Sequence, residues 1–218
     1  MSKTVSATYT FSEKILLACG LMASLLYLAM LAFIPMLWPG YSSASQTVSE
    51  LSAIASPTRV IWFPIGITYA LLITAFGYGI WKTADMNHPL RLAGGFLLVY
   101  GVLCIFWPPM HQREALAAGA HSLTDTLHFV FTMITVFLMM IALGFGAISF
   151  GKRFRIYSFG TMLIVLVLVI ITGTYASAVA ANLPTPMAGV FERIYICVFL
   201  LWVMVLSVML LREENNMA

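Results

Sequence analysis

The chain has 218 residues, of which 61% are hydrophobic and only 9% are charged, and its formal net charge is +3. Soluble domains carry about a quarter charged residues, so this composition excludes a cytosolic enzyme, a disordered linker and a secreted disulfide domain. Lipid must therefore contact most of the surface, and the small positive charge reflects membrane topology and anionic lipid rather than nucleic-acid binding.

Six apolar runs are long enough to cross a bilayer as helices, which need about 20 residues each. They cover residues 15–37, 59–81, 90–109, 124–148, 156–180 and 188–211. Proline, glycine or charged residues separate the runs, and the first run lacks the cleavage site of a signal peptide. Because membrane-spanning strands alternate in polarity, the sequence predicts an all-α protein with one domain, 1–218, of six transmembrane helices.

The basic residues predict the orientation, because Lys and Arg accumulate in loops on the cytoplasmic side. With a cytoplasmic N-terminus, eight basic residues face the cytoplasm: Lys3, Lys14, Lys82, Arg91, Lys152, Arg153, Arg155 and Arg212. Only Arg59, Arg113 and Arg193 then lie on the outer side. Both the N-terminus and the C-terminus are therefore expected to face the cytoplasm.

The first outer loop contains a predicted short helix near residues 48–55, lying in the membrane interface. Its apolar residues recur at helical spacing, and Thr47 with Glu50 three positions later forms a capping box. Glu50 is then either a simple helix cap or, together with Ser49, part of a polar cluster at the mouth of the bundle. A serine beside histidine and carboxylate suggests a hydrolase, but the chain lacks the GxSxG motif of serine hydrolases.

The fourth span begins with three polar residues at helical spacing, His121, Asp125 and His128. At 100° per residue their side chains share one face of a helix that extends back through His121. Two imidazoles and a carboxylate so arranged could bind zinc or a similar divalent metal. Alternatively Thr124 caps the helix, Asp125 favours its positive end, and His121 precedes the helix altogether.

The sixth span places Glu192 and Arg193 about one turn below the membrane surface, where ionisable groups usually face the bundle interior and mark functional sites. One interpretation is an internal network in which Arg193 pairs with Asp125 and Glu192 hydrogen-bonds to His128. The other is that Arg193 binds a phosphate or carboxylate of a ligand, for which its planar group of donors is suited.

The middles of all six spans carry no Asp, Glu, Lys, Arg or His, whereas the outer side gathers most of the polar chemistry. This asymmetry predicts an outward-facing polar pocket. Its expected ligand-binding residues are Ser49, His111, His128 and Arg193, its candidate metal ligands are His121, Asp125 and His128, and its candidate catalytic carboxylates are Glu50 and Glu192.

Four short motifs resemble a bacterial six-span family catalogued as domain of unknown function 998. They are SEL at 49–51, the Pro108–Pro109 exit of the third span, DTLH at 125–128 and GVFERI at 189–194. The resemblance covers nearly the whole chain. It implies six spans in the bacterial inner (plasma) membrane and no known activity, so Ser49, Glu50, His128, Glu192 and Arg193 correspond only as polar positions. Where the family pattern has an acidic residue after the proline, this chain has Met110 and His111.

The leading functional hypothesis is that the pocket binds or moves an amphiphilic small molecule or lipid, with polar side chains on its head and apolar helix walls on its tail. The alternatives are a metal-dependent intramembrane hydrolase, with Glu50 or Glu192 as its base, and a structural accessory subunit. Membrane lipids and a small amphiphilic ligand are the expected partners. The sequence is compatible with a monomer or a homo-oligomer, and with an enzyme or a protein without catalytic activity.

Overall fold

The structure is a computed structural model in which residues 9–215 are described. Lys3, one of the eight basic residues used to predict the orientation, lies outside the described residues. Over the described range the chain forms helices and no strands, apart from an isolated β-bridge between Ile54 and His111.

Six long helices are apolar enough to cross a membrane, which confirms the predicted all-α, multi-pass fold. They are α1 (Phe11–Phe33), extended by the 3-10 helix η1 (Ile34–Leu37), α2 (Arg59–Thr83), α3 (His88–Ile105), α5 (Leu123–Ser149), α6 (Lys152–Gly173) and α8 (Ala188–Asn215). Three shorter elements connect them: η2 (Val48–Ser52), α4 (Arg113–Ala117) and α7 (Ala176–Ala180).

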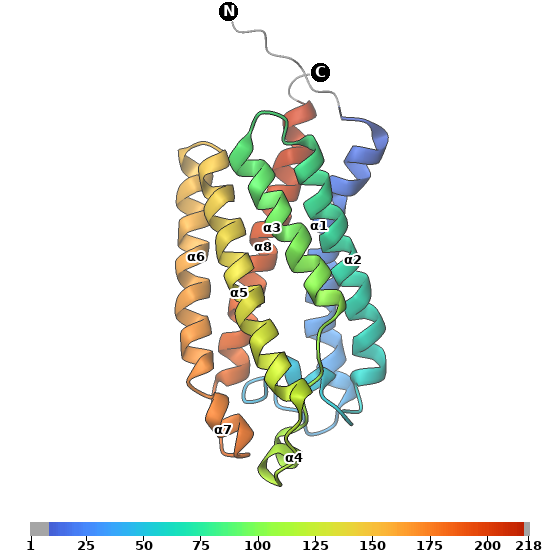
Figure 1. Cartoon of the computed structure of the whole chain (residues 1–218), viewed down its shortest axis with the longest axis vertical. Coiled ribbons are helices and arrows are strands. Elements are labelled where there is room, and N and C mark those ends of the chain that lie inside the picture. The colour runs from blue at the N-terminus through green and yellow to red at the C-terminus, as the bar shows by residue number, and fades with distance from the viewer. Residues whose placement is uncertain (1–8, 216–218) are drawn as a thin grey trace, which may run out of the picture.

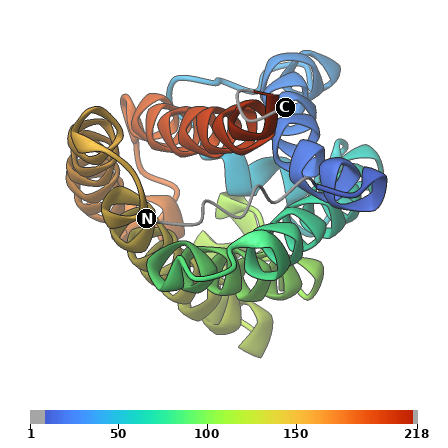
Figure 2. The same cartoon turned by 90° about the horizontal axis from the view of Figure 1, so that it is seen from above.

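The long helices form a closed ring in chain order, seen from above in Figure 2. Each helix packs against the next one in the sequence, and α8 completes the ring by packing against α1. Large buried side chains fill the interior, among them Phe76, Leu97, Phe199 and Trp202. Because water is absent from the core of a bilayer, such helices satisfy their own backbone groups and associate by close packing.

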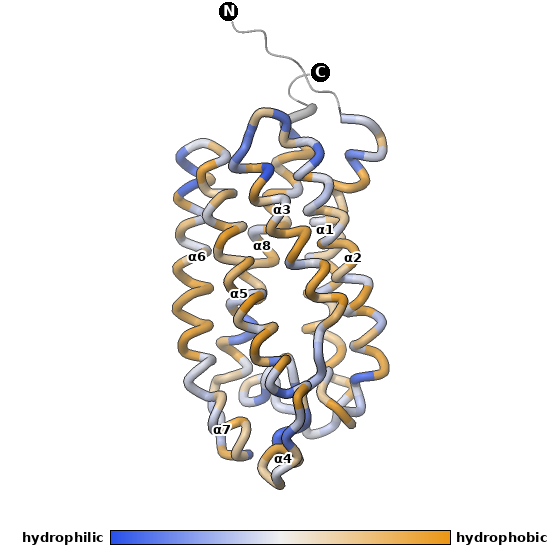
Figure 3. Tube along the Cα trace, viewed as in Figure 1, coloured by the Kyte–Doolittle hydropathy of each residue, from blue (hydrophilic) through white to orange (hydrophobic). Residues whose placement is uncertain are grey.

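The two ends of the bundle differ. The start of α1 and the end of α8 lie at one end, whereas η2, α4 and α7 lie at the other, which we call the η2 end (Figure 1). Hydropathy follows the same axis, with hydrophobic residues along the middle of the helices and hydrophilic residues toward both ends (Figure 3). The distribution of basic residues predicts that the η2 end faces outward, and this orientation stays a prediction.

The third span is shorter than predicted, because α3 ends at Ile105 and not at residue 109. Proline has no N–H to donate and disfavours a helical residue before it, so Pro108 and Pro109 prevent a further turn. The chain continues without helical structure to α4. Since α3 packs between α2 and α5, its early end leaves space between these two helices at the η2 end.

The fifth span also ends early, at Gly173 and not at residue 180. Glycine is a poor helix former, and after a turn the chain resumes as the separate helix α7. The other four helices start or end within a few residues of the predicted runs. These two early helix ends add to the non-helical chain at the η2 end, where the loop between η1 and α2 also lies.

Candidate functional site

The segment between η1 and α2 folds over the η2 end of the bundle, and η2 is its centre. Thr47 and Glu50 form the predicted capping box, with the Thr47 amide donating to Glu50 Oε2 at 2.7 Å. The helix is a short 3-10 helix over 48–52, so the predicted range 48–55 was too long. Val48 and Leu51 are buried against residues of α1 and α2, and this apolar side holds η2 down on the bundle.

Glu50 is more than a cap, because it also forms a buried ion pair with Arg113 of α4. Arg113 Nε donates to Glu50 Oε1 and Arg113 Nη2 to Glu50 Oε2, both at 2.7 Å. Donating these hydrogen bonds to the Glu50 carboxylate raises the pKa of Arg113 above its usual value. Arg113 Nη1 also donates to Thr185 Oγ1, whose hydroxyl donates to the Ser45 carbonyl. This two-point ion pair joins η2, α4 and the segment before α8.

Glu192 of α8 contacts the start of η2 from the side that faces the bundle. Its Oε2 accepts a hydrogen bond from the Val48 amide at 2.6 Å, and its side chain is buried. The predicted bond from Glu192 to His128 is wrong, because both ring nitrogens of His128 are bonded elsewhere. Glu192 therefore fixes the position of η2 and at the same time contributes a carboxylate to the lining of a pocket.

Arg193 binds backbone and not an acidic partner, so the predicted bridge to Asp125 is wrong. Its Nη1 donates to the carbonyls of Ser43, Gln46 and Gly189. Its Nη2 donates to Tyr41 Oη at 2.7 Å, and Tyr41 in turn donates to the Thr47 carbonyl. Burial raises the pKa of Tyr41 although Arg193 acts in the opposite direction, so the phenol stays neutral and can donate. Arg193 thus holds the loop before η2 against α8.

Asp125 pairs with His111 at the start of α5. Asp125 Oδ1 accepts from the His111 amide at 2.7 Å, and Oδ2 lies 2.9 Å from His111 Nδ1. Oδ2 also accepts from the amide and hydroxyl of Ser122, which is the helix N-cap in place of Thr124. These contacts tie the chain after α3 to the start of α5 and use the carboxylate of Asp125 fully.

The structure does not bring the three expected metal ligands together. His121 is exposed and precedes α5, which begins at Leu123. Asp125 is occupied by His111 and Ser122, and His128 is bonded to Pro108 and Ser49. Within residues 9–215, no group of three or more His, Cys, Asp or Glu side chains is placed to hold a metal ion. A zinc site at these residues would therefore need a rearrangement of all three side chains.

His128 and Ser49 form the contact with the clearest chemical implication. His128 Nδ1 lies 2.8 Å from the Pro108 carbonyl, and His128 Nε2 lies 3.1 Å from Ser49 Oγ. A carbonyl only accepts, so Nδ1 must carry the proton. In the neutral ring Nε2 is then an acceptor for the Ser49 hydroxyl. The edge-to-face contact between Trp107 and His128, with ring centroids 5.3 Å apart, further fixes the orientation of the imidazole.

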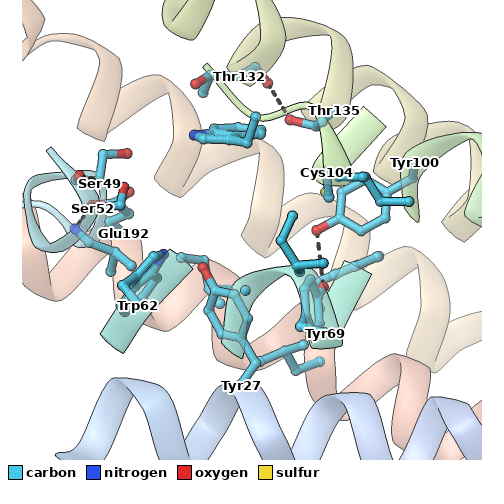
Figure 4. Close-up of a pocket in the computed structure, with 18 of the residues that line it drawn as sticks. Tyr27, Ser49, Ser52, Trp62, Tyr69, Tyr100, Cys104, Thr132, Thr135 and Glu192 are labelled. Carbon is cyan, nitrogen blue, oxygen red and sulfur yellow. Dashed lines mark hydrogen bonds between the residues drawn. The ribbon is translucent and has the colours of Figure 1, made fainter. Parts of the chain in front are cut away.

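A cavity of about 160 Å³ lies under η2, in the space left by the early end of α3. Its polar side is formed by Ser49, Ser52, Arg59 and Glu192. Tyr69, Tyr100 and Cys104 lie at the opposite side, and Trp62 and Tyr27 line the wall between (Figure 4). The hydroxyls of Tyr69 and Tyr100 bond to each other at 3.1 Å, so the inner side offers mainly aromatic and aliphatic surface. The cavity is therefore amphiphilic along its length.

Apart from the exposed His121, the expected site residues separate into two groups. Ser49 and Glu192 line the cavity and His128 bonds to Ser49, whereas Glu50, His111, Asp125 and Arg193 hold the surrounding loops together. Arg59 was expected only as one of the few basic residues on the outer side, yet it lines the cavity. Its Nη1 donates to the Ser52 carbonyl at 2.6 Å, which uses one of the five N–H donors of a guanidinium.

Comparison with known proteins places the chain in a family. A family described as "Protein of unknown function (DUF998)" matches residues 21–209, which include most of the six spans and all four motifs. No curated protein and no solved structure matches the chain.

Proposed function

Because the chain belongs to the DUF998 family of proteins of unknown function, we propose its function from the geometry of the site: it binds an amphiphilic small molecule or lipid in the cavity under η2. The observation that carries this proposal is the division of the cavity into a side with Arg59, Ser49, Ser52 and Glu192 and a side with aromatic residues. Ligand sites in proteins combine mostly apolar walls with a few polar groups that fix orientation.

The size of the cavity favours a ligand that enters only in part. An apolar cavity of about 150 Å³ holds one benzene molecule, so a cavity of about 160 Å³ holds a head group or a short length of chain. Phe63 of α2 lines the cavity and is 54% exposed on the outside of the bundle. A longer tail can therefore leave beside Phe63 and continue among the lipid chains.

Arg59 and the serine hydroxyls of the cavity favour a ligand with a polar, acceptor-rich head, whereas the Glu192 carboxylate already accepts from the Val48 amide. Arg59 supplies donors and a positive charge, and Ser49 and Ser52 supply hydroxyls. Esters, carboxylates and phosphates all present acceptors to such a set. We place the protein in the bacterial inner membrane with this cavity toward the outside, in keeping with the distribution of its basic residues.

Filling the cavity tests the proposal. Gly66 lines the cavity, and a Cβ at this position meets only Trp62, at 3.9 Å. We expect Gly66→Phe to put a ring of benzene size into the cavity and to reduce the fraction of lipid-bound protein roughly tenfold, a change of about 1.4 kcal/mol. Native mass spectrometry of the protein released from detergent micelles measures this fraction.

Gly160→Phe is the matched control. Gly160 lies on an exposed face of α6, where a Cβ meets nothing within 4 Å, so the same ring is added toward the lipid. This variant should retain the bound species of the wild-type protein. A wild-type protein without any bound amphiphile, or equal retention by Gly66→Phe and the control, contradicts the proposed function and favours a structural accessory role.

A further inference from the structure

We propose that Ser49 and His128 are a nucleophile and its general base, and that the protein cleaves or transfers an acyl group of an ester-bearing amphiphile. This inference rests on the proposed binding function, because the cavity under η2 would hold the ester. Its basis is the geometry of three groups from distant parts of the chain: a serine in η2, a histidine in α5 and a carbonyl after α3.

The arrangement has the parts that activate a serine. An activated nucleophile lies within about 2.6–3.2 Å of its base, and a third group orients the base. Ser49 Oγ and His128 Nε2 are 3.1 Å apart, and the Pro108 carbonyl holds the Nδ1 proton at 2.8 Å. In serine hydrolases a carboxylate orients the imidazole, and here a backbone carbonyl occupies that position.

The surroundings favour reaction over simple packing. Ser49 lines the cavity and His128 is buried behind it, so the hydroxyl faces the bound molecule and the base is shielded from solvent. Arg59 lies at the same side of the cavity and supplies a positive charge for the oxygen that becomes negative during attack. Glu192 bonds the amide of Val48, next to Ser49, and thereby helps to fix the nucleophile.

The reaction is balanced with water as the second reactant. Ser49 Oγ bonds to the ester carbonyl carbon while its proton passes to His128 Nε2 and the C=O electron pair moves to oxygen. When the intermediate collapses, the bond to the alcohol oxygen breaks, and the leaving alkoxide takes the proton from Nε2. Water then attacks the acyl group on Ser49 and gives its proton to Nε2. Finally Ser49 leaves and recovers that proton, and a carboxylic acid is released.

A fluorophosphonate with a decyl chain tests the nucleophile directly, because it forms a stable bond with an activated serine. We expect the full-length protein in detergent to gain one adduct, which peptide mass spectrometry assigns to Ser49. Ser49→Ala should gain none. His128→Gln keeps hydrogen-bonding capacity but cannot accept the proton, and should react at least about 100-fold more slowly, since general bases contribute about 10²–10⁴-fold. Hydrolysis of p-nitrophenyl decanoate should fall by a similar factor.

Two matched variants serve as controls. Ser43→Ala changes an exposed serine of the same loop, and His88→Gln changes an exposed histidine at the opposite end of the bundle. Both should react as the wild-type protein does. Absence of an adduct at Ser49 in folded wild-type protein, or equal rates in wild-type protein and His128→Gln, overturns the inference.

The same samples separate failure of this inference from failure of the proposed function. If native mass spectrometry finds a bound amphiphile that Gly66→Phe loses, but Ser49 gains no adduct, the cavity binds and does not catalyse. If the protein retains no amphiphile and gains no adduct, both proposals fail.

Discussion

Replacing Arg113 by methionine is expected to destabilise the protein by about 3–5 kcal/mol, because the change leaves Glu50 as a buried charge without its partner. Methionine keeps much of the aliphatic volume of arginine, so the loss reports the ion pair and not a cavity. Glu50 is 1% exposed and Arg113 8%, and the pair has two hydrogen bonds of 2.7 Å. Reversible unfolding in detergent measures the change.

A double variant separates the cost of the orphaned charge from the value of the pair itself. Glu50→Gln/Arg113→Met removes both charges but keeps an oxygen for the Thr47 amide. It should be clearly more stable than Arg113→Met alone, since a buried ion pair replaced as a whole often costs little. Arg155→Met, at an exposed site of α6, should change stability by less than about 0.5 kcal/mol. Equal losses in the single and double variants would show that the charge of Glu50 is not the cause.

The second large effect is expected from Gly189→Ala at the start of α8. The loop before η2 lies directly on this glycine: the Gly189 amide donates to the Ala44 carbonyl, and an added Cβ would overlap with the carbonyl oxygens of Ser43 and Gln46. Because backbone atoms cannot rotate away, the loop must shift and lose bonds to Arg193. We expect a loss of at least about 1–3 kcal/mol, as for overpacking elsewhere, together with loss of bound amphiphile.

Thermal unfolding in detergent and native mass spectrometry measure the two expected effects of Gly189→Ala. Gly160→Ala is the control, because it adds the same methyl group where it meets nothing within 4 Å. A Gly189→Ala protein that unfolds at the wild-type temperature and keeps its amphiphile would show that the loop does not depend on this close contact.

The six spans could be predicted because hydrophobic length is a strong local signal, and the errors lie where local chemistry overrides it. The runs 90–109 and 156–180 continue in apolar residues past the ends of α3 and α6. Hydropathy alone does not register that Pro108 and Pro109 cannot continue a helix. The capping box of Thr47 and Glu50 was predictable because it is a local pattern, formed by two residues three positions apart in the sequence.

The candidate site could be predicted as a region but not as a set of contacts. The gathering of polar residues near one end follows from sequence once the spans are placed. The pairing of Arg193 with Asp125 was wrong because it depends on how each helix is rotated and on the path of the loop before η2. That loop offers the backbone carbonyls of Ser43 and Gln46 to Arg193, and no side-chain pattern encodes such acceptors.

Arg59 and Arg113 were missed as site residues although a signal was available. On the predicted outer side there are only three basic residues, and each buried acid there requires a partner. Counting charges in this way would have made Arg113 a candidate partner of Glu50. The Ser49–His128 contact has no comparable signal, because it joins residues 79 positions apart and involves the carbonyl of Pro108.

In the non-helical chain after α3, the need to satisfy backbone hydrogen-bonding groups limits which amino acids are tolerated. Two successive residues there, Pro108 and Pro109, have no backbone N–H group. The Pro108 carbonyl accepts from His128, and the Met110 carbonyl accepts from the Ile54 amide. The His111 amide donates to Asp125. Residues other than proline at these positions would add backbone N–H groups, which lipid cannot solvate. The two prolines therefore let a non-helical segment form part of the cavity wall with fewer backbone donors to satisfy. Replacing either proline with alanine would add a backbone N–H group that needs a new hydrogen-bond partner.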